Sequence, residues 1–408
     1  MRALRQVLVG FIVCTVVVLL TGCDVPCVGG LCLLGAPRPT GTTPNDVVLV
    51  RCGDVRTALV PASADGRLDA IGVDIDTDTG GVFLGVGTQP WAVAAVSGTA
   101  VQAVVTLFGS HEVALLDPCA GIVLARVVDE ELLPLSAPAV LREAIDADGD
   151  GVASRTVDAM LPRAPEAVVV VGRRAFVSYT NVLELSDRPG ARPTLGPGTI
   201  GVFDIGDSSL QQIARVVLPC DNPQGLAVDE EGARVVASCS GVLGIGDDGR
   251  VRQLSPGGIA VVDVETLTLL WAMELEGAAF GTPHVVNDDI VVGDLLAPRV
   301  RTFTMLAPSQ RVFERSLVTT DVTDSVFSIT ARHGTLLAPV FAHDLIVADP
   351  FAPEPRTLVA RHTATLPRGL MKIAHDDDGA VLLFSLAAEI VPFDVDAWLL
   401  ADSAEQQP

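Results

Sequence analysis

The chain has 408 residues, of which 50 are acidic and 27 are lysine or arginine, so its formal net charge at pH 7 is −23. This acidity argues against nucleic acid as a partner, because binding to phosphates requires a basic face. It also argues against direct contact with anionic lipid headgroups, whereas it favours solubility and the recruitment of cations.

The N-terminus has the organisation of an export signal. Arg2 and Arg5 form a basic region, and an apolar stretch follows at 7–20. This stretch is shorter than the roughly 20 apolar residues that a membrane-spanning helix needs. We therefore expect a signal peptide over 1–22 rather than a transmembrane segment.

The residues LTGC at 20–23 resemble the lipobox of bacterial lipoproteins, in which the cysteine is lipidated and becomes the mature N-terminus. The resemblance implies lipidation of Cys23 and anchoring of the protein to a membrane of the bacterial cell envelope. Asp24 can favour the inner membrane in enteric bacteria, but we expect the outer membrane, with the protein facing either the periplasm or the exterior. The alternative is an ordinary signal peptide with a cysteine there by chance.

Residues 23–43 are rich in Gly, Pro and Thr and are predicted to be a tether between the lipid and a folded domain. Of the eight cysteines, Cys14 is removed with the signal and Cys23 carries the lipid, which leaves an even number in an exported chain and predicts disulfides. No CxxC spacing occurs, which argues against zinc or redox chemistry. We expect Cys27 to pair with Cys32, Cys220 with Cys239 across one hairpin, and Cys52 with Cys119 by elimination.

The stretch 222–270 predicts the fold. It contains two pairs of short β-rich runs, GLAVDEEGARVVAS and GGIAVVDVETLTLL, each broken by an acidic or glycine turn that is typical of a hairpin. Four antiparallel strands in about 50 residues match one blade of a β-propeller. A single blade cannot bury both of its faces, so further copies must pack beside it.

Similar units recur along the chain, each opened by a proline or a serine and followed by turn residues where a hairpin needs them. Seven openings predict an all-β propeller of seven four-stranded blades over 44–402, with six or eight blades as alternatives and a tail at 403–408. The openings are Pro44, Pro90, Pro165, Pro223, Pro283, Ser325 and Pro367.

The repeat resembles that of YVTN and lactonase-type seven-bladed propellers, most closely over the unit that begins at Asn222 and more loosely over the rest of 44–400. The resemblance implies a scaffold. Propellers of this kind serve as enzymes, binding platforms and assembly factors, so the fold does not decide the function.

Three long insertions, at 129–161, 181–197 and 242–256, fall in neighbouring blades. In a meander of four strands, the loop between the second and third strands lies on the same face as the connection to the next blade. All three insertions are therefore expected on one face, where long loops held by a rigid scaffold commonly bind partners. The alternative is surface decoration that caps the channel.

The first insertion contains Asp146, Asp148 and Asp150 followed by Gly151, the spacing that brings alternate carboxylates to one hard cation. An EF-hand would place an acid at position 12 of the loop, whereas here Asp158 comes one residue late. We therefore predict a structural calcium site formed by the three loop carboxylates and Asp158, rather than a complete EF-hand. An unliganded acidic turn is the alternative.

The chain has no HExxH, GxSxG or P-loop motif. The residues that follow the blade openings should surround the channel mouth on the face with the insertions, and several could bind a small polar ligand or a metal. The alternative is an ordinary hydrated channel lining. The candidate ligand residues are Trp91, Glu166, Gln224, His284 and Arg368, with Asn45 and Val326 completing the ring.

Two functions follow from these observations. The preferred one is a monomeric, non-catalytic lipoprotein that presents the insertions to a protein or glycan partner. The alternative is a lactonase-like hydrolase with a metal or an acid/base group at the channel mouth. Glu166 and His284 are the first candidates for that group.

Overall fold

The structure is a computed structural model that describes residues 37–399 apart from 75–77, 97, 99–100, 143–153, 185–193, 246–250, 306–312, 318–324, 343–344, 354 and 360–368. Several predicted features lie outside the described residues, among them the signal peptide and most of the tether. The same is true of Cys23, Cys27, Cys32, Arg368, and Asp146, Asp148 and Asp150 of the predicted calcium loop.

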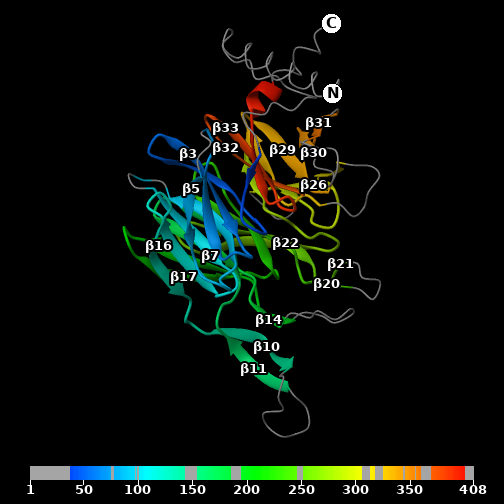
Figure 1. Cartoon of the computed structure of the whole chain (residues 1–408). Helices are drawn as coiled ribbons and strands as arrows, with labels where there is room; N and C mark the ends of the chain where they lie inside the picture. The colour runs from blue at the N-terminus through cyan, green and yellow to red at the C-terminus, as the bar shows by residue number, and fades with distance from the viewer. Residues whose placement is uncertain are drawn as a thin grey trace, which may run out of the picture.

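Seven antiparallel sheets of four strands surround a central axis (Figure 1), which confirms the all-β propeller and its seven blades. Blade 1 consists of β2 (Val48–Cys52), β3 (Val55–Ala62), β4 (Arg67–Gly72) and β5 (Asp78–Phe83), and blade 2 of β6 (Pro90–Val96), β7 (Gln102–Leu107), β8 (Glu112–Asp117) and β9 (Ile122–Val128). Blade 3 consists of β12 (Pro165–Val171), β13 (Arg174–Tyr179), β16 (Thr199–Ile205) and β17 (Leu210–Val217), and blade 4 of β18 (Pro223–Val228), β19 (Arg234–Cys239), β22 (Gly257–Asp263) and β23 (Leu269–Leu275). Blade 5 consists of β24 (His284–Val286), β25 (Asp289–Gly293), β26 (Arg299–Thr304) and β27 (Phe313–Ser316), and blade 6 of β28 (Thr330–Arg332), β29 (Thr335–Val340), β30 (Leu345–Ala348) and β31 (Arg356–Val359).

Blade 7 closes the ring with strands from both ends of the described chain. Its inner strands are β32 (Leu370–Asp376), β33 (Gly379–Phe384) and β34 (Glu389–Phe393), and its outer strand is β1 (Arg38–Pro39). The pairing of β1 with β34 is antiparallel, with Arg38 opposite Ile390 and Pro39 opposite Glu389. Two residues of the segment expected to be a tether therefore belong to the propeller, where they cover an edge that would otherwise expose unpaired backbone groups.

The hydrophobic core lies between neighbouring blades. The middle strands, such as β7 (QAVVTL) and β33 (GAVLLF), are buried along their whole length, because each of their two faces packs on an adjacent blade. Between blades 2 and 3, for example, Val104 and Leu115 share one cluster with Val177 and Phe203. The outer strand β9, by contrast, is partly or fully exposed at every residue.

Each insertion contains a two-stranded hairpin, and the three hairpins project from the same side of the propeller (Figure 1). We call this side the crown face and the opposite side, which carries the tight turns within each blade, the turn face. The hairpins of the crown are β10 (Leu133–Arg142) with β11 (Ser154–Met160), β14 (Val182–Glu184) with β15 (Thr194–Leu195), and β20 (Leu243–Ile245) with β21 (Val251–Gln253).

Two disulfides confirm two of the three predicted pairings. Cys220 and Cys239, with Cα atoms 6.0 Å apart, join the connection before blade 4 to the end of β19. Cys52 and Cys119, with Cα atoms 5.3 Å apart, join the end of β2 in blade 1 to a turn of blade 2.

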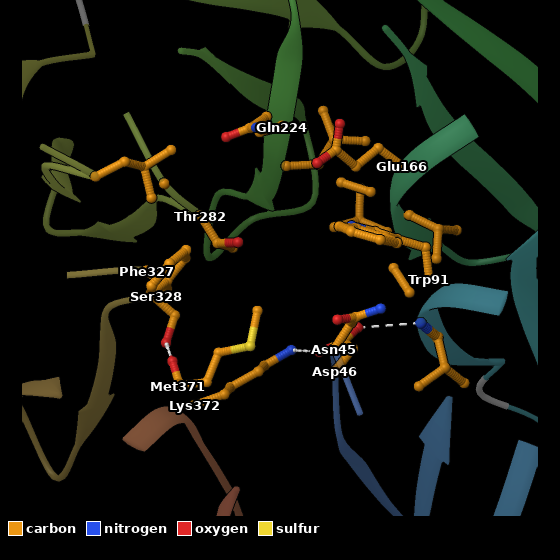
Figure 2. Close-up of a pocket in the computed structure, with 18 residues that line it drawn as sticks. Asn45, Asp46, Trp91, Glu166, Gln224, Thr282, Phe327, Ser328, Met371 and Lys372 are labelled. Atoms are coloured by element: carbon orange, nitrogen blue, oxygen red, sulfur yellow. Dashed lines mark hydrogen bonds and ion pairs between the residues drawn. The ribbon is translucent and has the colours of Figure 1, made fainter. Parts of the chain in front are cut away.

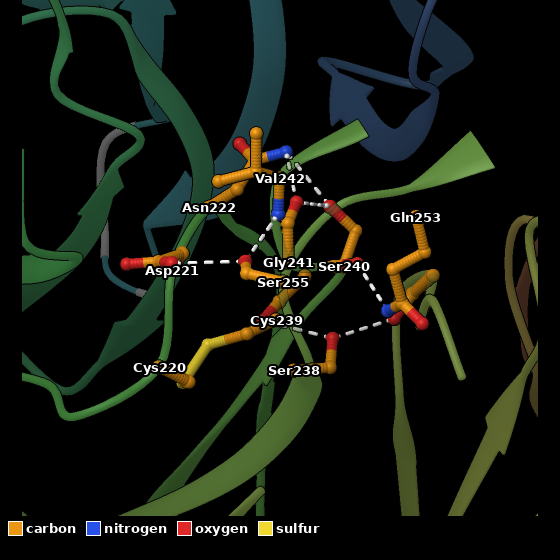
Figure 3. Close-up of a disulfide and its surroundings, with 12 residues drawn as sticks. Cys220, Asp221, Asn222, Ser238, Cys239, Ser240, Gly241, Val242, Gln253 and Ser255 are labelled. Carbon is orange, nitrogen blue, oxygen red and sulfur yellow. Dashed lines mark hydrogen bonds between the residues drawn. A yellow bond between two sulfur atoms is a disulfide. The ribbon is translucent and has the colours of Figure 1, made fainter. Parts of the chain in front are cut away.

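Figure 3 shows that the Cys220–Cys239 disulfide lies beneath the β20–β21 hairpin. A hydrogen-bond network surrounds it: Ser255 donates to Asp221 at 2.9 Å, and the Gln253 side chain donates to the carbonyl oxygens of Ser240 and Ala278. The base of this hairpin is thus held both covalently and by hydrogen bonds.

The described chain includes one short helix, at 395–399, which packs Trp398 against Phe393 of blade 7. Within the described residues, no helix is long and apolar enough to span a membrane.

Candidate functional site at the centre of the crown face

A cavity of about 210 Å³ occupies the central channel where the first strands of the blades begin. All seven blades contribute to its wall, at equivalent positions around the ring. Its polar lining residues are Asn45, Asp46, Trp91, Glu166, Gln224, Thr282, Ser328 and Lys372, and its apolar lining includes Val93, Val168, Leu226, Leu295, Phe327 and Met371.

Irregular strand pairing directs these side chains into the channel. The register shifts just after the opening residue in blades 2, 3 and 4, at Pro90, Pro165 and Pro223. A bulge changes the direction in which the adjacent side chain points, and here the residue after each proline lines the cavity. The sequence pattern of a proline followed by a variable residue is therefore what places Trp91, Glu166 and Gln224.

The structure brings together four members of the predicted ring, namely Trp91, Glu166, Gln224 and Asn45. His284 does not line the cavity, because Thr282 pairs in parallel with Ser328 of the next blade and so occupies the equivalent place two residues earlier. Val326 does not line the cavity either, and Phe327 and Ser328 represent blade 6 in its wall. Arg368 lies outside the described residues, and Met371 and Lys372 represent blade 7 in the cavity wall.

His284 lies close enough to His375 and Glu230 to interact with their charges. Both histidines are partly buried, and burial lowers the pKa of His284 and of His375. The neighbouring charge of Arg332 lowers the pKa of His375 further, and His375 Nε2 lies 3.0 Å from the Thr330 hydroxyl. These imidazoles are on strands β24 and β32 and do not line the cavity.

One side of the cavity contains an ion pair that the sequence analysis did not identify, between Lys372 and Asp46 (Figure 2). The Asp46 carboxylate also accepts hydrogen bonds from the backbone of Val47 at 2.8 Å and of Val93 at 3.0 Å, so it joins blades 1, 2 and 7. Lys372 is the only lysine of the chain, but no sequence pattern connects it with Asp46, which is 326 residues away.

The other side of the cavity contains Glu166, which is 6% exposed. Burial raises the pKa of this carboxyl group to about 8, and a hydrogen bond from the Trp91 side chain opposes the rise only in part. Among the described residues, no cationic group contributes to the shift. The Trp91 ring in turn packs on Phe108, with ring centroids 5.2 Å apart.

Two further polar side chains line the cavity, that of Gln224 from the next blade after Glu166 and that of Thr282 from the blade after that (Figure 2). Neither side chain makes a hydrogen bond with another described residue, and both are partly exposed. Together with Glu166 they provide three groups with oxygen atoms that can accept a hydrogen bond from a bound molecule.

Within the described ranges, no three His, Cys, Asp or Glu side chains are grouped as a metal site would require. Asp158, the fourth predicted calcium ligand, is exposed on β11. Its three predicted partners are outside the described residues, so the calcium site stays a prediction.

The chain matches no protein-family model and no curated protein sequence. Among solved structures it is similar to hydrazine synthase from Kuenenia stuttgartiensis, with 10% identity, a TM-score of 0.58, and coverage of 86% of this chain and 96% of that chain. It is also similar to a chain of the mitotic checkpoint complex, with 9% identity, a TM-score of 0.59, and coverage of 92% and 98%. A third similar structure is the β-propeller domain of Cps50 (Swd1) from Myceliophteria thermophila, with 11% identity, a TM-score of 0.55, and coverage of 88% and 99%.

Identities near 10% show a shared propeller fold and no shared activity. Function must therefore be argued from the residues of the crown face and of the cavity.

Proposed function

We propose that this protein is a non-catalytic binding or scaffold protein of the bacterial cell envelope, anchored through a lipid on Cys23, which presents its crown face to a protein or glycan partner. The observation that carries the proposal is the placement of three hairpins from neighbouring blades around one face of a rigid propeller. Loops on a rigid scaffold place binding groups accurately at little cost in conformational entropy.

The contacts that hold the crown-face hairpins to the blades support this proposal. The β20–β21 hairpin is held at its base by the Cys220–Cys239 disulfide, and the segment that leads into β10 is held to β17 by Arg215. A surface held in this way is organised before it meets a partner. Solved propellers of similar fold include a chain of the mitotic checkpoint complex, which is itself a protein assembly.

The direction of β1 indicates how the crown would be oriented. β34 runs from Glu389 near the crown face to Phe393 near the turn face, so the antiparallel β1 runs toward the crown face. A tether that enters from the turn side would leave the crown directed away from the membrane. Fourteen residues lie between Cys23 and Arg38, so the fifteen Cα–Cα steps allow a reach of up to about 50 Å.

Cross-linking from both faces in the envelope of the native host tests the binding face. A photoreactive amino acid at Leu132 or Leu254, both exposed on the crown side, should give a discrete cross-linked adduct. The matched control positions are Asp207 and Glu265 in exposed turns of the opposite face, which should give none. Adducts from the turn face alone, or from neither face, would contradict the proposal.

The hydrolase alternative has one favourable observation, namely that Glu166 is a buried acid that keeps its proton near neutral pH. It is weakened because the cavity does not bring His284 beside Glu166. Hydrolysis of a simple lactone that is lost in both Glu166→Gln and His284→Gln variants would favour this alternative over the binding function.

A further inference from the structure

Among the residues that the structure describes, the Glu166 carboxyl group has no cationic partner, although it is buried. It comes from β12, lines the cavity, and within the described ranges has only the Trp91 side chain as a hydrogen-bond donor. Ionised carboxylates buried in proteins are normally paired with a cation, because transfer of an isolated charge out of water is costly. Glu166 is therefore suited to meet a positive charge that the described part of the chain does not provide.

The neighbouring groups match the hydrogen-bonding needs of an ammonium group. A primary ammonium has three N–H donors and no acceptor. Glu166, Gln224 and Thr282 line the cavity from blades 3, 4 and 5, and each has an oxygen that can accept. The Trp91 ring beside Glu166 offers an aromatic surface (Figure 2). Such a surface attracts cations.

The charge balance of the cavity also favours a cation. Its described lining residues include two carboxyl groups, Asp46 and Glu166, and one cationic group, Lys372, which is already paired with Asp46. An ammonium group beside Glu166 would make the ionised cavity neutral. The net charge of −23 further raises the local concentration of small cations and lowers that of anions.

We propose that the cavity binds the ammonium group of a small organic amine, with Glu166 as its counter-ion, Gln224 and Thr282 as further acceptors, and the apolar body of the amine against Val168, Leu226 and Phe327. The volume of about 210 Å³ is below the roughly 300–1,000 Å³ of pockets that hold drug-sized ligands. The amine is therefore small, either a free metabolite or the lysine side chain of a partner inserted from the crown face. The amine site is a separate proposal from the binding face, because its occupancy can be tested with small amines in the absence of any partner.

Binding of this kind must be coupled to the loss of a proton. With a pKa of about 8, Glu166 is protonated in about nine molecules out of ten at pH 7, and an ammonium group binds its ionised form. Amine affinity should therefore rise close to tenfold per pH unit from pH 6 to pH 7 and level off above pH 8. At pH 7 about 0.9 proton should be released for each amine bound.

Calorimetric titration of the purified full-length protein with benzylamine and with benzyl alcohol, its neutral analogue, tests the proposal. The titrations are made between pH 6 and pH 8 in two buffers of different ionisation enthalpy, neither of which is a primary amine. We expect saturable binding of benzylamine with the pH dependence and proton release given above. N-acetyl-lysine amide mimics the lysine side chain of a partner. Tighter binding of this compound than of benzylamine would indicate a partner lysine as the natural ligand, and weaker binding would indicate a free amine.

Three variants test whether the calorimetric binding of benzylamine depends on Glu166 and Trp91. Glu166→Gln should weaken benzylamine binding at pH 8 at least tenfold and remove its pH dependence. Trp91→Phe keeps the ring but removes the N–H donor, so it should shift the midpoint of the pH dependence upward. Glu274→Gln, on the exposed outer strand β23, is the matched control and should change neither quantity.

Four results would overturn the proposal. These are no binding of benzylamine, equal binding of the alcohol and the amine, an affinity that falls as pH rises from 6 to 8, and unchanged amine binding in Glu166→Gln. The third result would show that the protonated Glu166 donates to a neutral ligand instead. Cross-linking from the crown face would be unaffected by any of them, so the two proposals fail separately.

Discussion

Asp129 and Arg215 form a buried ion pair that fastens the first hairpin of the crown to blade 3. The Asp129 side chain is fully buried and accepts from Arg215 Nε at 3.0 Å and from Gln212 Nε2 at 2.6 Å. The Arg215 guanidinium also donates to the Glu131 carbonyl oxygen at 2.9 Å. The chain is thus held immediately before it enters β10.

Replacement of Asp129 by alanine should destabilise the protein strongly. It leaves the guanidinium of Arg215, which is 9% exposed, buried without its counter-ion. Loss of one partner of a buried pair costs about 3–5 kcal/mol of the free energy of unfolding, to be measured by urea denaturation. The exposed pair of Arg173 with Asp207 provides the control, since Asp207→Ala should cost less than about 1 kcal/mol. Equal effects of the two substitutions would contradict this role for Asp129.

Glu166 should make the protein less stable as pH rises. The pKa of its carboxyl group is about 8 in the folded protein and 4.5 as a model value for the unfolded chain. Between these two values the folded state keeps a proton that the unfolded state has lost, so the free energy of unfolding falls with rising pH. The contribution of Glu166 is complete below pH 4.5 and is lost by pH 8, which amounts to roughly 3–5 kcal/mol.

The difference in the free energy of unfolding between wild type and Glu166→Gln isolates this contribution, because all other titrating groups are shared. The two proteins should have the same free energy of unfolding at about pH 4.5, and the variant should be more stable by several kcal/mol at pH 8.5, as measured by urea denaturation. A difference in stability that does not change between these two pH values would show that Glu166 is ionised in the folded state.

The Cys220–Cys239 disulfide should protect the β20–β21 hairpin. The two cysteines are 19 residues apart, and closure of a loop of this length stabilises a protein by about 3 kcal/mol in the chain-entropy account. The double substitution by alanine should lower the melting temperature and allow trypsin to cut after Arg252 in β21. The double substitution of Cys52 and Cys119 should also lower the melting temperature, but Arg252 should stay as resistant to trypsin as it is in wild type. Equal cutting in both variants would contradict a local role.

The predicted calcium loop can be tested by metal analysis. We expect one calcium ion per chain in the purified protein, and its loss together with several degrees of melting temperature in Asp148→Ala, because a bound ion stabilises the folded state by mass action. Asp117→Ala, in a turn of blade 2, is the control and should retain the ion. A protein without calcium, or a variant that keeps it, would refute the site.

Much of the fold could be predicted from the sequence, because each blade repeats the same local signals. The prolines at 90, 165 and 223 and the turns at 172–173 and 231–232 lie where the structure begins strands and closes hairpins. The closing strand β1 could not be predicted, since two residues of a Gly- and Pro-rich segment have no strand pattern and pair only because blade 7 offers an edge.

The candidate site was predicted in part. Trp91, Glu166 and Gln224 follow their prolines directly and share one register, whereas His284 was placed by the same counting and lies elsewhere. In blade 5 the position is set by pairing of Thr282 with Ser328 from another blade, which no local pattern encodes. The Asp46–Lys372 pair joins the two ends of the described chain and could be inferred only once the ring is closed.

The most direct test of the cavity as a binding site uses its single lysine. Reductive methylation with ¹³C-formaldehyde labels Lys372 as the only lysine of the chain, and its ¹³C signal is followed by NMR during titration with benzylamine at pH 8. We expect a saturable shift of this signal in wild type and in Glu274→Gln, with the midpoint found by calorimetry, and at most a weak shift in Glu166→Gln. An unchanged Lys372 signal at amine concentrations that saturate the calorimetric titration would show that the amine binds elsewhere and would contradict the account.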